Sequence, residues 1–443
     1  MIVIKPHIGV LVWSWLSYMN PHRLTWGATY DFQFAQIVAL VTMGAWLVSR
    51  EPKRVPLTPI TVLLFLFAAW MCVTTAFALA PDPAFEKWKL VMKILLITII
   101  TLPLMQTRER LNALIWVIVL SVSFYGLKGG IFVILTGGHY TVWGPPESFL
   151  EANNSLGLAL TMILPLMRYL QMQSQSLLIR SAWTVGMALC ALSVLSTYSR
   201  GAVLAISAML FFLWLKSSKK LIIGAVGMVA IVGALSFMPE AWYDRVKSIQ
   251  DYESDNSAMS RIKMWRYGFN VATERPFVGG GFGVFPETSL YPRFGLSVCA
   301  SGQEITADCV LAGVNSHSIY FETLGEHGFV GLVLFLMIGF VAFRTGTWVI
   351  LRVRDRPDLK WSRDLAGMSQ VALVGFAIGG LFVNRAYFDL YYHLLAIIVL
   401  NGVIVAKTLE TAAPSEERQV PAERPLGAGP LPSRPPATPS RHL

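Results

Sequence analysis

The sequence is dominated by long apolar runs that are separated by short polar connections. A helix needs about 20 apolar residues to cross a hydrocarbon core of roughly 30 Å. Runs of about this length, the first and the eighth being shorter, lie at residues 6–19, 32–48, 57–79, 88–105, 111–135, 154–170, 179–198, 201–215, 221–238, 324–343, 365–384 and 388–406. Only 14% of the residues are charged, against roughly 25% in soluble domains. The pattern predicts an all-α polytopic membrane protein with about 12 transmembrane helices.

The distribution of lysine and arginine predicts how these helices are oriented. Short loops rich in Lys and Arg stay in the cytoplasm, and basic connections alternate here with connections that carry few such residues. The basic connections are 49–54, 106–110, 168–180, 216–220 and 344–363. Both termini are therefore expected in the cytoplasm. These loops and their attraction to anionic lipid explain the net charge of +10 without a nucleic-acid partner.

This topology divides the chain into four regions. Residues 1–238 are expected to carry transmembrane helices 1–9, and residues 324–407 the last three. Between them, residues 239–323 form an external loop that is too long for a simple connection. Residues 408–443 are rich in proline and polar groups, so a disordered cytoplasmic tail is predicted there.

The external loop is predicted to contain a helix at residues 257–274 with apolar residues at a spacing of three to four. This stripe comprises Ile262, Trp265, Phe269 and Ala272, and it is flanked by Arg261 and Arg266. The glycines within residues 279–283 would let the backbone approach another segment closely. Because the sequence there lacks the Lys-Ser/Thr of a P-loop, nucleotide binding is not expected.

Two cysteines, Cys299 and Cys309, share the external loop. An oxidising compartment permits a disulfide there. A bridge also requires a suitable separation of the two Cα atoms, which a sequence does not supply. A disulfide and two free thiols therefore both remain open.

Arg200 lies in "STYSRGA", between two apolar runs with almost no loop between them. The second run, residues 201–215, covers only about 22 Å at a rise of 1.5 Å per residue, less than the thickness of the core. The turn is therefore expected below the outer membrane surface. An arginine at that depth is costly unless it lines a polar cavity or pairs with an anion, and its planar fork suits phosphate.

His317 precedes the run that is predicted to enter the membrane near Leu324. Seven residues of helical rise would place the ring about 10 Å above that point, at the height of lipid phosphates. An imidazole there can act as a base near neutral pH, and a hydrogen-bonded interfacial histidine is the alternative. His327 is expected to serve helix packing.

One histidine and two or three arginines are thus expected on the same side of the membrane and at similar depth. The long external loop beside them could form a lid. Together these features favour a lipid-linked phosphate or pyrophosphate substrate and make His317 the candidate base.

The order of the motifs resembles that of the O-antigen ligase superfamily, which includes lipopolysaccharide O-antigen ligases, O-antigen polymerases and bacterial protein O-oligosaccharyltransferases. The motifs are SRG at the end of a span, R-x-x-x-W from Arg261 to Trp265, P-x-x-G-x-G-x-G from Pro276 to Gly283, and His317 leading into "ETLGEHGFVGL". The resemblance covers about residues 154–400. The N-terminal "NPHRLTWGATYDF" is similar to the branch of O-glycosylation ligases found beside exosortase systems.

The resemblance implies a GT-C-like glycosyltransferase of the multi-span class that needs no metal and no cofactor. It would take a glycan from undecaprenyl pyrophosphate on the periplasmic side of the bacterial inner membrane and transfer it to the lipid A–core oligosaccharide. Arg200 and Arg261 would hold the pyrophosphate, and His317 would be the general base. Arg266 is a further substrate-binding candidate.

The motifs are shared across the superfamily, so a protein Ser/Thr or another glycan repeat remains open as the acceptor. The enzyme would then be a protein O-oligosaccharyltransferase or an O-antigen polymerase. A secondary transporter is a more remote alternative. Transporters carry ionisable residues or broken helices near the membrane midplane, whereas charges within the predicted spans are scarce.

Overall fold

The computed structural model describes residues 1–30, 32–217, 219–240, 242–243, 256–299, 309–310 and 313–412. The chain divides into two units, Met1–Val405 and Ala406–Leu443, and the first contains every candidate site residue. Regular structure in the described residues is almost entirely helical. The exception is a parallel pair of two-residue strands, β1 (Ser297–Val298) and β2 (Cys309–Val310).

A helix lies at each of the twelve ranges that the apolar runs predict. These helices are α1 (Pro6–Met19), α2 (Phe34–Val48), α3 (Pro59–Ala76), α4 (Pro81–Leu104), α5 (Arg108–Thr136), α6 (Asn153–Gln173), α7 (Leu177–Leu195), α8 (Arg200–Lys216), α9 (Lys220–Phe237), α12 (Ile319–Arg352), α13 (Lys360–Gly379) and α14 (Asp389–Ala412).

Seven helical segments within the described residues are long and apolar enough to cross a membrane. They are α3, α5, α6, α7, α12, α14 and the segment Pro357–Phe382 that contains α13. The structure is therefore that of a helical protein with several candidate membrane spans, and the count of twelve crossings stays a prediction.

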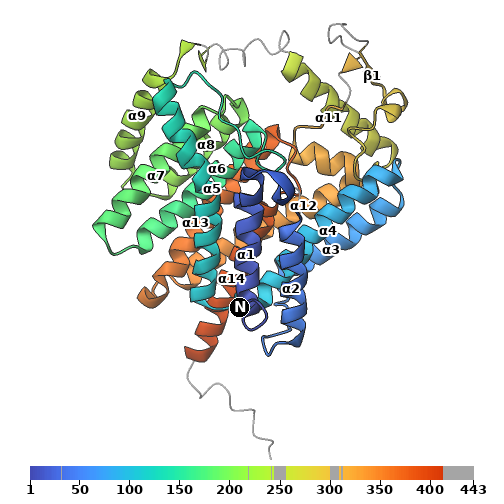
Figure 1. Cartoon of the computed structure of the whole chain (residues 1–443). Coiled ribbons are helices and arrows are strands. Elements are labelled where there is room, and N and C mark those ends of the chain that lie inside the picture. Colours follow the sequence, from blue (N-terminus) through green and yellow to red (C-terminus); the bar gives the residue numbers. More distant parts are fainter. Residues whose placement is uncertain are drawn as a thin grey trace, which may run out of the picture. The chain divides into compact units, whose positions relative to one another are not determined.

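Within the first unit, the helices pack in two groups that α12 and α13 connect. α5 packs against α1, α6 and α7, and α13 packs against α6, α8 and α12. α12 also contacts α3 and α11 (Asn256–Glu274), and α3 contacts α4. Figure 1 shows α7, α8 and α9 on one side and α3, α4 and α11 on the other. α12 therefore joins the helix of the external loop to the apolar core.

α12 is interrupted at Gly328, where φ is 67° and ψ is −171°. The glycine-rich loop after α11 packs against this interruption. Gly280 N donates to Gly325 O at 2.8 Å, Gly281 N donates to Glu326 O at 2.9 Å, and Phe329 N donates to Pro276 O at 2.8 Å. A Cβ on Gly279 would lie 2.6 Å from Gly328 N. The expected close backbone approach is confirmed, and the partner of the loop is α12.

Several helix boundaries differ from those predicted, and two of them change the predicted division of the chain into regions. α12 begins at Ile319 rather than at residue 324, so residues 319–323 are helical instead of part of the loop. α14 continues to Ala412, past the predicted start of the tail at residue 408, and residues 413–443 lie outside the described part. The predictions marked only the apolar stretch of each helix, whereas backbone hydrogen bonding continues into polar residues at its ends.

The buried face of α11 differs from the predicted apolar stripe. Ile262 and Phe269 of that stripe are exposed. The residues that α11 buries against the rest of the external loop are Met264, Tyr267 and Val271, which form a cluster with Phe285, Tyr291 and Phe294. Both faces of this helix carry apolar residues at helical spacing, so periodicity alone could not decide which face is covered.

Cys299 and Cys309 form a disulfide, with their Cα atoms 5.0 Å apart. The bond lies beside the β1–β2 pair, where Cys299 N donates to Val310 O at 3.0 Å. Lys263 of α11 donates from Nζ to Cys309 O at 3.1 Å. Of the two states that the sequence left open, the structure has the bridge, and α11 packs against it.

Candidate active site at the start of α12

His317 lies two residues before the first turn of α12, outside the helix. Its φ is 47°, in the left-handed region that few non-glycine residues adopt. Its Nδ1 is buried, and neither ring nitrogen is hydrogen-bonded to a described residue. The height predicted from helical rise does not apply, because the helix begins after this residue. A strained backbone next to a ring without hydrogen-bond partners is a feature of functional sites.

The surroundings of His317 keep its ring neutral. Burial is the main cause that lowers the pKa of His317, and the charges of Arg261 and Arg385 lower it further, while Glu322 opposes them. The resulting pKa is about 4, against an ordinary value of 6.5. At neutral pH the imidazole is therefore unprotonated, which is the state that a general base requires.

α11 holds Arg261 next to His317. Trp265 of this helix donates from Nε1 to Ser316 O at 2.8 Å and stacks on Phe321, with ring centroids 5.2 Å apart. Arg261 precedes Trp265 by one helical turn and so shares its face. Arg266 is exposed and lies about 140° around the helix from Arg261. The structure thus brings Arg261 and His317 together, while Arg266 lies on another face.

Arg200 is the first residue of α8. Ser199 caps the helix by accepting a hydrogen bond from Ala202 N at 3.2 Å. Gly201 packs tightly against Phe382 of the turn η6 (Gly380–Phe382). The other end of η6, at Gly380, packs against Ile319 of α12. The start of α8 and the start of α12 therefore contact the same turn. Arg200 is not among the charges that shift the pKa of His317, so its predicted place beside His317 stays a prediction.

The sequence did not predict a buried ionic cluster that begins one turn after His317. Lys87 of α4 donates to Glu322 Oε1 at 2.9 Å and to Glu326 Oε1 at 2.7 Å. Tyr387 donates to Glu326 Oε2 at 2.8 Å, and Gly283 N donates to Glu326 Oε1 at 3.0 Å. Both carboxylates are almost fully buried. The cluster fixes the start of α12 to α4, to the glycine-rich loop and to the segment before α14.

One sequence signal for this cluster exists. Glu322 and Glu326 are four residues apart, so on a helix they share one face. Their partner Lys87 lies more than two hundred residues earlier, and nothing in its surroundings marks it as their counterion. The assignment required the packing of α3 against both α4 and α12.

His327 has the structural role that was predicted for it. Its Nδ1 lies 2.7 Å from Thr74 Oγ1, and its backbone carbonyl accepts a hydrogen bond from Trp70 Nε1 at 3.1 Å. The ring is fully buried against Phe282 and Tyr387. His327 therefore ties α12 to α3.

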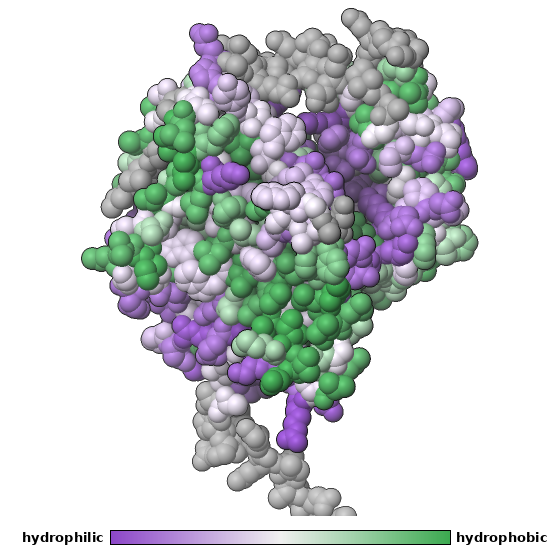
Figure 2. Space-filling view, in the orientation of Figure 1, coloured by the Kyte–Doolittle hydropathy of each residue, from purple (hydrophilic) through white to green (hydrophobic). Residues whose placement is uncertain are grey.

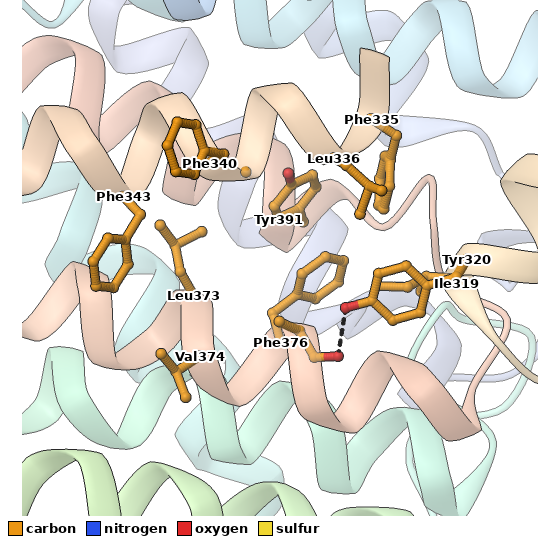
Figure 3. A pocket seen from close by; sticks show the side chains of 12 residues that line it. Ile319, Tyr320, Phe335, Leu336, Phe340, Phe343, Leu373, Val374, Phe376 and Tyr391 are labelled. Carbon is orange, nitrogen blue, oxygen red and sulfur yellow. Dashed lines mark hydrogen bonds between the residues drawn. The ribbon is translucent and has the colours of Figure 1, made fainter. Parts of the chain in front are cut away.

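An apolar cavity of about 200 Å³ begins two residues after His317. It lies between α12, α13 and α14, and in Figure 3 Ile319 and Tyr320 lie at one end and Phe343 at the other. Tyr320 donates to Ala377 O at 2.8 Å, the hydrogen bond drawn in Figure 3. The remaining side chains that line the cavity are Phe335, Leu336, Phe340, Leu373, Val374, Phe376 and Tyr391. Such a lining suits a hydrocarbon chain.

The molecular surface combines polar and apolar areas. On the face seen in Figure 2, hydrophilic residues line a recess in the upper part, and apolar residues cover much of the surface below it. This distribution suits a protein that handles a charged group at the edge of a membrane.

Comparisons with known proteins find two family matches along the chain. Residues 185–336 match the model of the family described as O-Antigen ligase, a range that contains Arg200, Arg261 and His317. Residues 1–175 match a family of unknown function, DUF5935. A search of curated proteins returned no match. The sequence motifs and the match over residues 185–336 support membership of the chain in the O-antigen ligase superfamily.

Proposed function

We propose that this protein transfers a glycan from undecaprenyl pyrophosphate to the lipid A–core oligosaccharide. The observation that carries the proposal is the position of His317. Its neutral ring lies within the field of Arg261 and Arg385, and an apolar cavity begins two residues further along the chain. A charged head group that carries a hydrocarbon chain fits both parts of such a site.

In the proposed reaction, the acceptor hydroxyl oxygen attacks the anomeric carbon of the glycan. The hydroxyl proton passes to His317, which works as the general base. The bond between the anomeric carbon and the pyrophosphate oxygen breaks with its electron pair, and undecaprenyl pyrophosphate leaves. Arg200 and Arg261 stabilise the negative charge of the leaving group, and the anomeric centre is inverted.

The proposed reaction takes place on the periplasmic side of the inner membrane. Lys- and Arg-rich connections, such as those at 216–220 and 344–363, are assigned to the cytoplasm. His317 and the disulfide-bonded loop belong to the opposite side under this assignment. A disulfide is stable in the periplasm and rare in the cytosol, which supports the same orientation.

The experiment that tests the proposal uses the purified full-length protein in liposomes with an undecaprenyl-pyrophosphate glycan. Lipid A–core, a Ser/Thr-containing acceptor protein and a second glycan donor are supplied in separate reactions. Transfer to lipid A–core is expected. Transfer to the protein or to the second glycan alone would replace the acceptor in the proposal, and the absence of any transfer would contradict the proposal as a whole.

A further inference from the structure

Arg385 lies in the segment between η6 and α14 and enters the function proposed above only through its charge, which lowers the pKa of His317. It is partly buried. Its Nε donates to Phe149 O at 3.1 Å and its Nη1 donates to Asn384 O at 3.3 Å. Both partners are neutral carbonyls. Among the described residues, no carboxylate forms an ion pair with this guanidinium. A buried charge is normally paired, so the guanidinium of Arg385 is expected to have an anionic partner.

Three carboxylates act on Arg385 through their charge, and each of them accepts hydrogen bonds from other groups. Glu322 accepts hydrogen bonds from Lys87 Nζ at 2.9 Å and from Ala386 N at 3.0 Å. Asp389 accepts from Ser17 Oγ at 2.6 Å and from Leu390 N at 2.8 Å. The third, Glu151, is exposed and accepts from Glu147 N at 3.1 Å. The positive charge of Arg385 is therefore not neutralised by a direct contact.

The backbone on both sides of Arg385 is held in place. The hydrogen bond from Ala386 N to Glu322 ties the segment to the first turn of α12. Tyr387 is bound to Glu326, and Phe388 N donates to Arg385 O at 3.2 Å. A guanidinium that is fixed in this way needs little reorganisation to bind a ligand.

Part of the guanidinium is available for such a ligand. Nη2 donates to no described residue, and it is not among the buried atoms that lack a partner. It therefore faces accessible space. The charge of Arg385 also acts on the His317 ring, together with those of Arg261 and Glu322. Arg385 thus belongs to the same electrostatic site as the proposed base.

We propose that Arg385 binds the phosphate groups of the lipid-linked pyrophosphate substrate, as a third arginine of the site beside Arg200 and Arg261. The inference rests on the proposed function, because it assigns a contact to that substrate. Guanidinium and phosphate pair through two parallel hydrogen bonds, and the donors left free on Arg385 can supply them. Glu322 is the residue that positions the segment through Ala386.

The test compares Arg385→Gln and Arg385→Lys with the matched control Arg293→Gln in the full-length protein. Arg293 is an arginine of the external loop, and it is exposed and paired with Glu274. Binding of inorganic pyrophosphate is measured by calorimetry, and KM for the lipid-linked donor by the transfer assay. Loss of a charge-assisted hydrogen bond predicts about 10- to 100-fold weaker pyrophosphate binding and a similar rise in KM for Arg385→Gln.

Arg385→Lys keeps the charge and is expected to lie between the wild type and Arg385→Gln, whereas Arg293→Gln should match the wild type. Removal of the charge should also move the acid limb of kcat/KM to higher pH, because Arg385 lowers the pKa of His317. If Arg385 only held the loop at Phe149 in place, its substitution would change the stability of the protein. Pyrophosphate affinity and the acid limb of kcat/KM would then stay unchanged. If Arg385→Gln is unstable, Arg385→Lys still tests pyrophosphate affinity and KM through the loss of the two parallel hydrogen bonds, and unchanged values in a folded Arg385→Lys enzyme would overturn the inference.

The inference and the proposed function fail in different ways. A wild type that transfers glycan, with Arg385 variants of unchanged pyrophosphate affinity and KM, would overturn the inference alone. A wild type that transfers nothing but binds pyrophosphate through Arg385 would contradict the proposed function and support the anion site.

Discussion

His317 has a left-handed backbone conformation, which costs on the order of 1–2 kcal/mol for a non-glycine residue. The contacts on either side of it maintain this conformation. Trp265 binds the carbonyl of Ser316, and Ser318 is buried where α12 begins. The backbone of His317 is therefore held in place just before α12, which helps to position a catalytic base.

The pH dependence of the reaction should reflect the lowered pKa of His317. A base works when it is unprotonated, and this ring gains its proton only near pH 4 in the free enzyme. We expect kcat/KM to change little between about pH 8 and pH 5 on account of this group, because kcat/KM reports the free enzyme. Bound pyrophosphate stabilises the imidazolium, so the acid limb of kcat should lie at higher pH than that of kcat/KM. A kcat/KM profile with half-loss near the ordinary histidine pKa of about 6.5 would show that His317 is not the base or is not buried.

At the residue scale, the sequence indicated candidate site residues but not their conformations. His317 and Arg261 were identifiable from residue type and position, and the structure places them together. The left-handed backbone of His317 could not be predicted, because it depends on Trp265 and on the packing of α11. Arg385 was also missed, because an arginine between two apolar runs looks like any other polar connection.

At the scale of single elements, the interruption of α12 depends on Gly328. A Cβ at this position would clash with the carbonyl of Phe277, and φ is 67°. Gly328→Ala is expected to destabilise the protein by about 1–3 kcal/mol. It should also lower glycan transfer, because the glycine-rich loop would lose its close contact with α12. Thermal unfolding in detergent measures the first effect.

Gly339→Ala is the matched control for this substitution. Gly339 lies in the same helix, and the nearest atom to a Cβ there is Tyr391 Oη at 3.5 Å, an ordinary contact. It should therefore unfold at the temperature of the wild type or slightly above. Equal unfolding temperatures for the two variants would argue against the close approach at Gly328.

The positions of the helices were the most predictable feature of this structure. Apolar runs located all the predicted helices, because length and hydropathy are local properties of the sequence. The face that α11 buries was not predictable, since Ile262 and Phe269 look as suitable for burial as Met264 and Tyr267. The break at Gly328 was not foreseen either, because the glycine belongs to a regular series, Gly325, Gly328 and Gly331, that also fits a straight packed helix.

At the scale of the whole first unit, Lys87 connects parts of the chain that are far apart in sequence. Lys87→Met would leave the buried carboxylates of Glu322 and Glu326 without their counterion. Such a loss typically costs about 3–5 kcal/mol, so a clear drop in unfolding temperature is expected. Lys89→Met is the control, because Lys89 is exposed and pairs with the exposed Glu86, and surface pairs contribute about 0–1 kcal/mol. Equal effects of the two substitutions would contradict the buried cluster.

The assembly of this ionic cluster could not be predicted from a single sequence. Glu322 and Glu326 share a helical face, but their pairing with Lys87 follows from the packing of α3 against both α4 and α12. The contact of the glycine-rich loop with α12 is likewise a long-range contact. Long-range partners depend on the tertiary fold, whereas apolar runs and charge asymmetry are readable along the chain.

The most direct test of the central claim is glycan transfer by His317→Ala in the reconstituted assay with lipid A–core. His139→Ala serves as the control, because His139 is an exposed histidine in the connection between α5 and α6. We expect His317→Ala to remain folded but to lose transfer by about 100-fold or more, the usual contribution of a general base, and His139→Ala to transfer at the wild-type rate. Wild-type transfer by a folded His317→Ala enzyme would show that His317 is not the base.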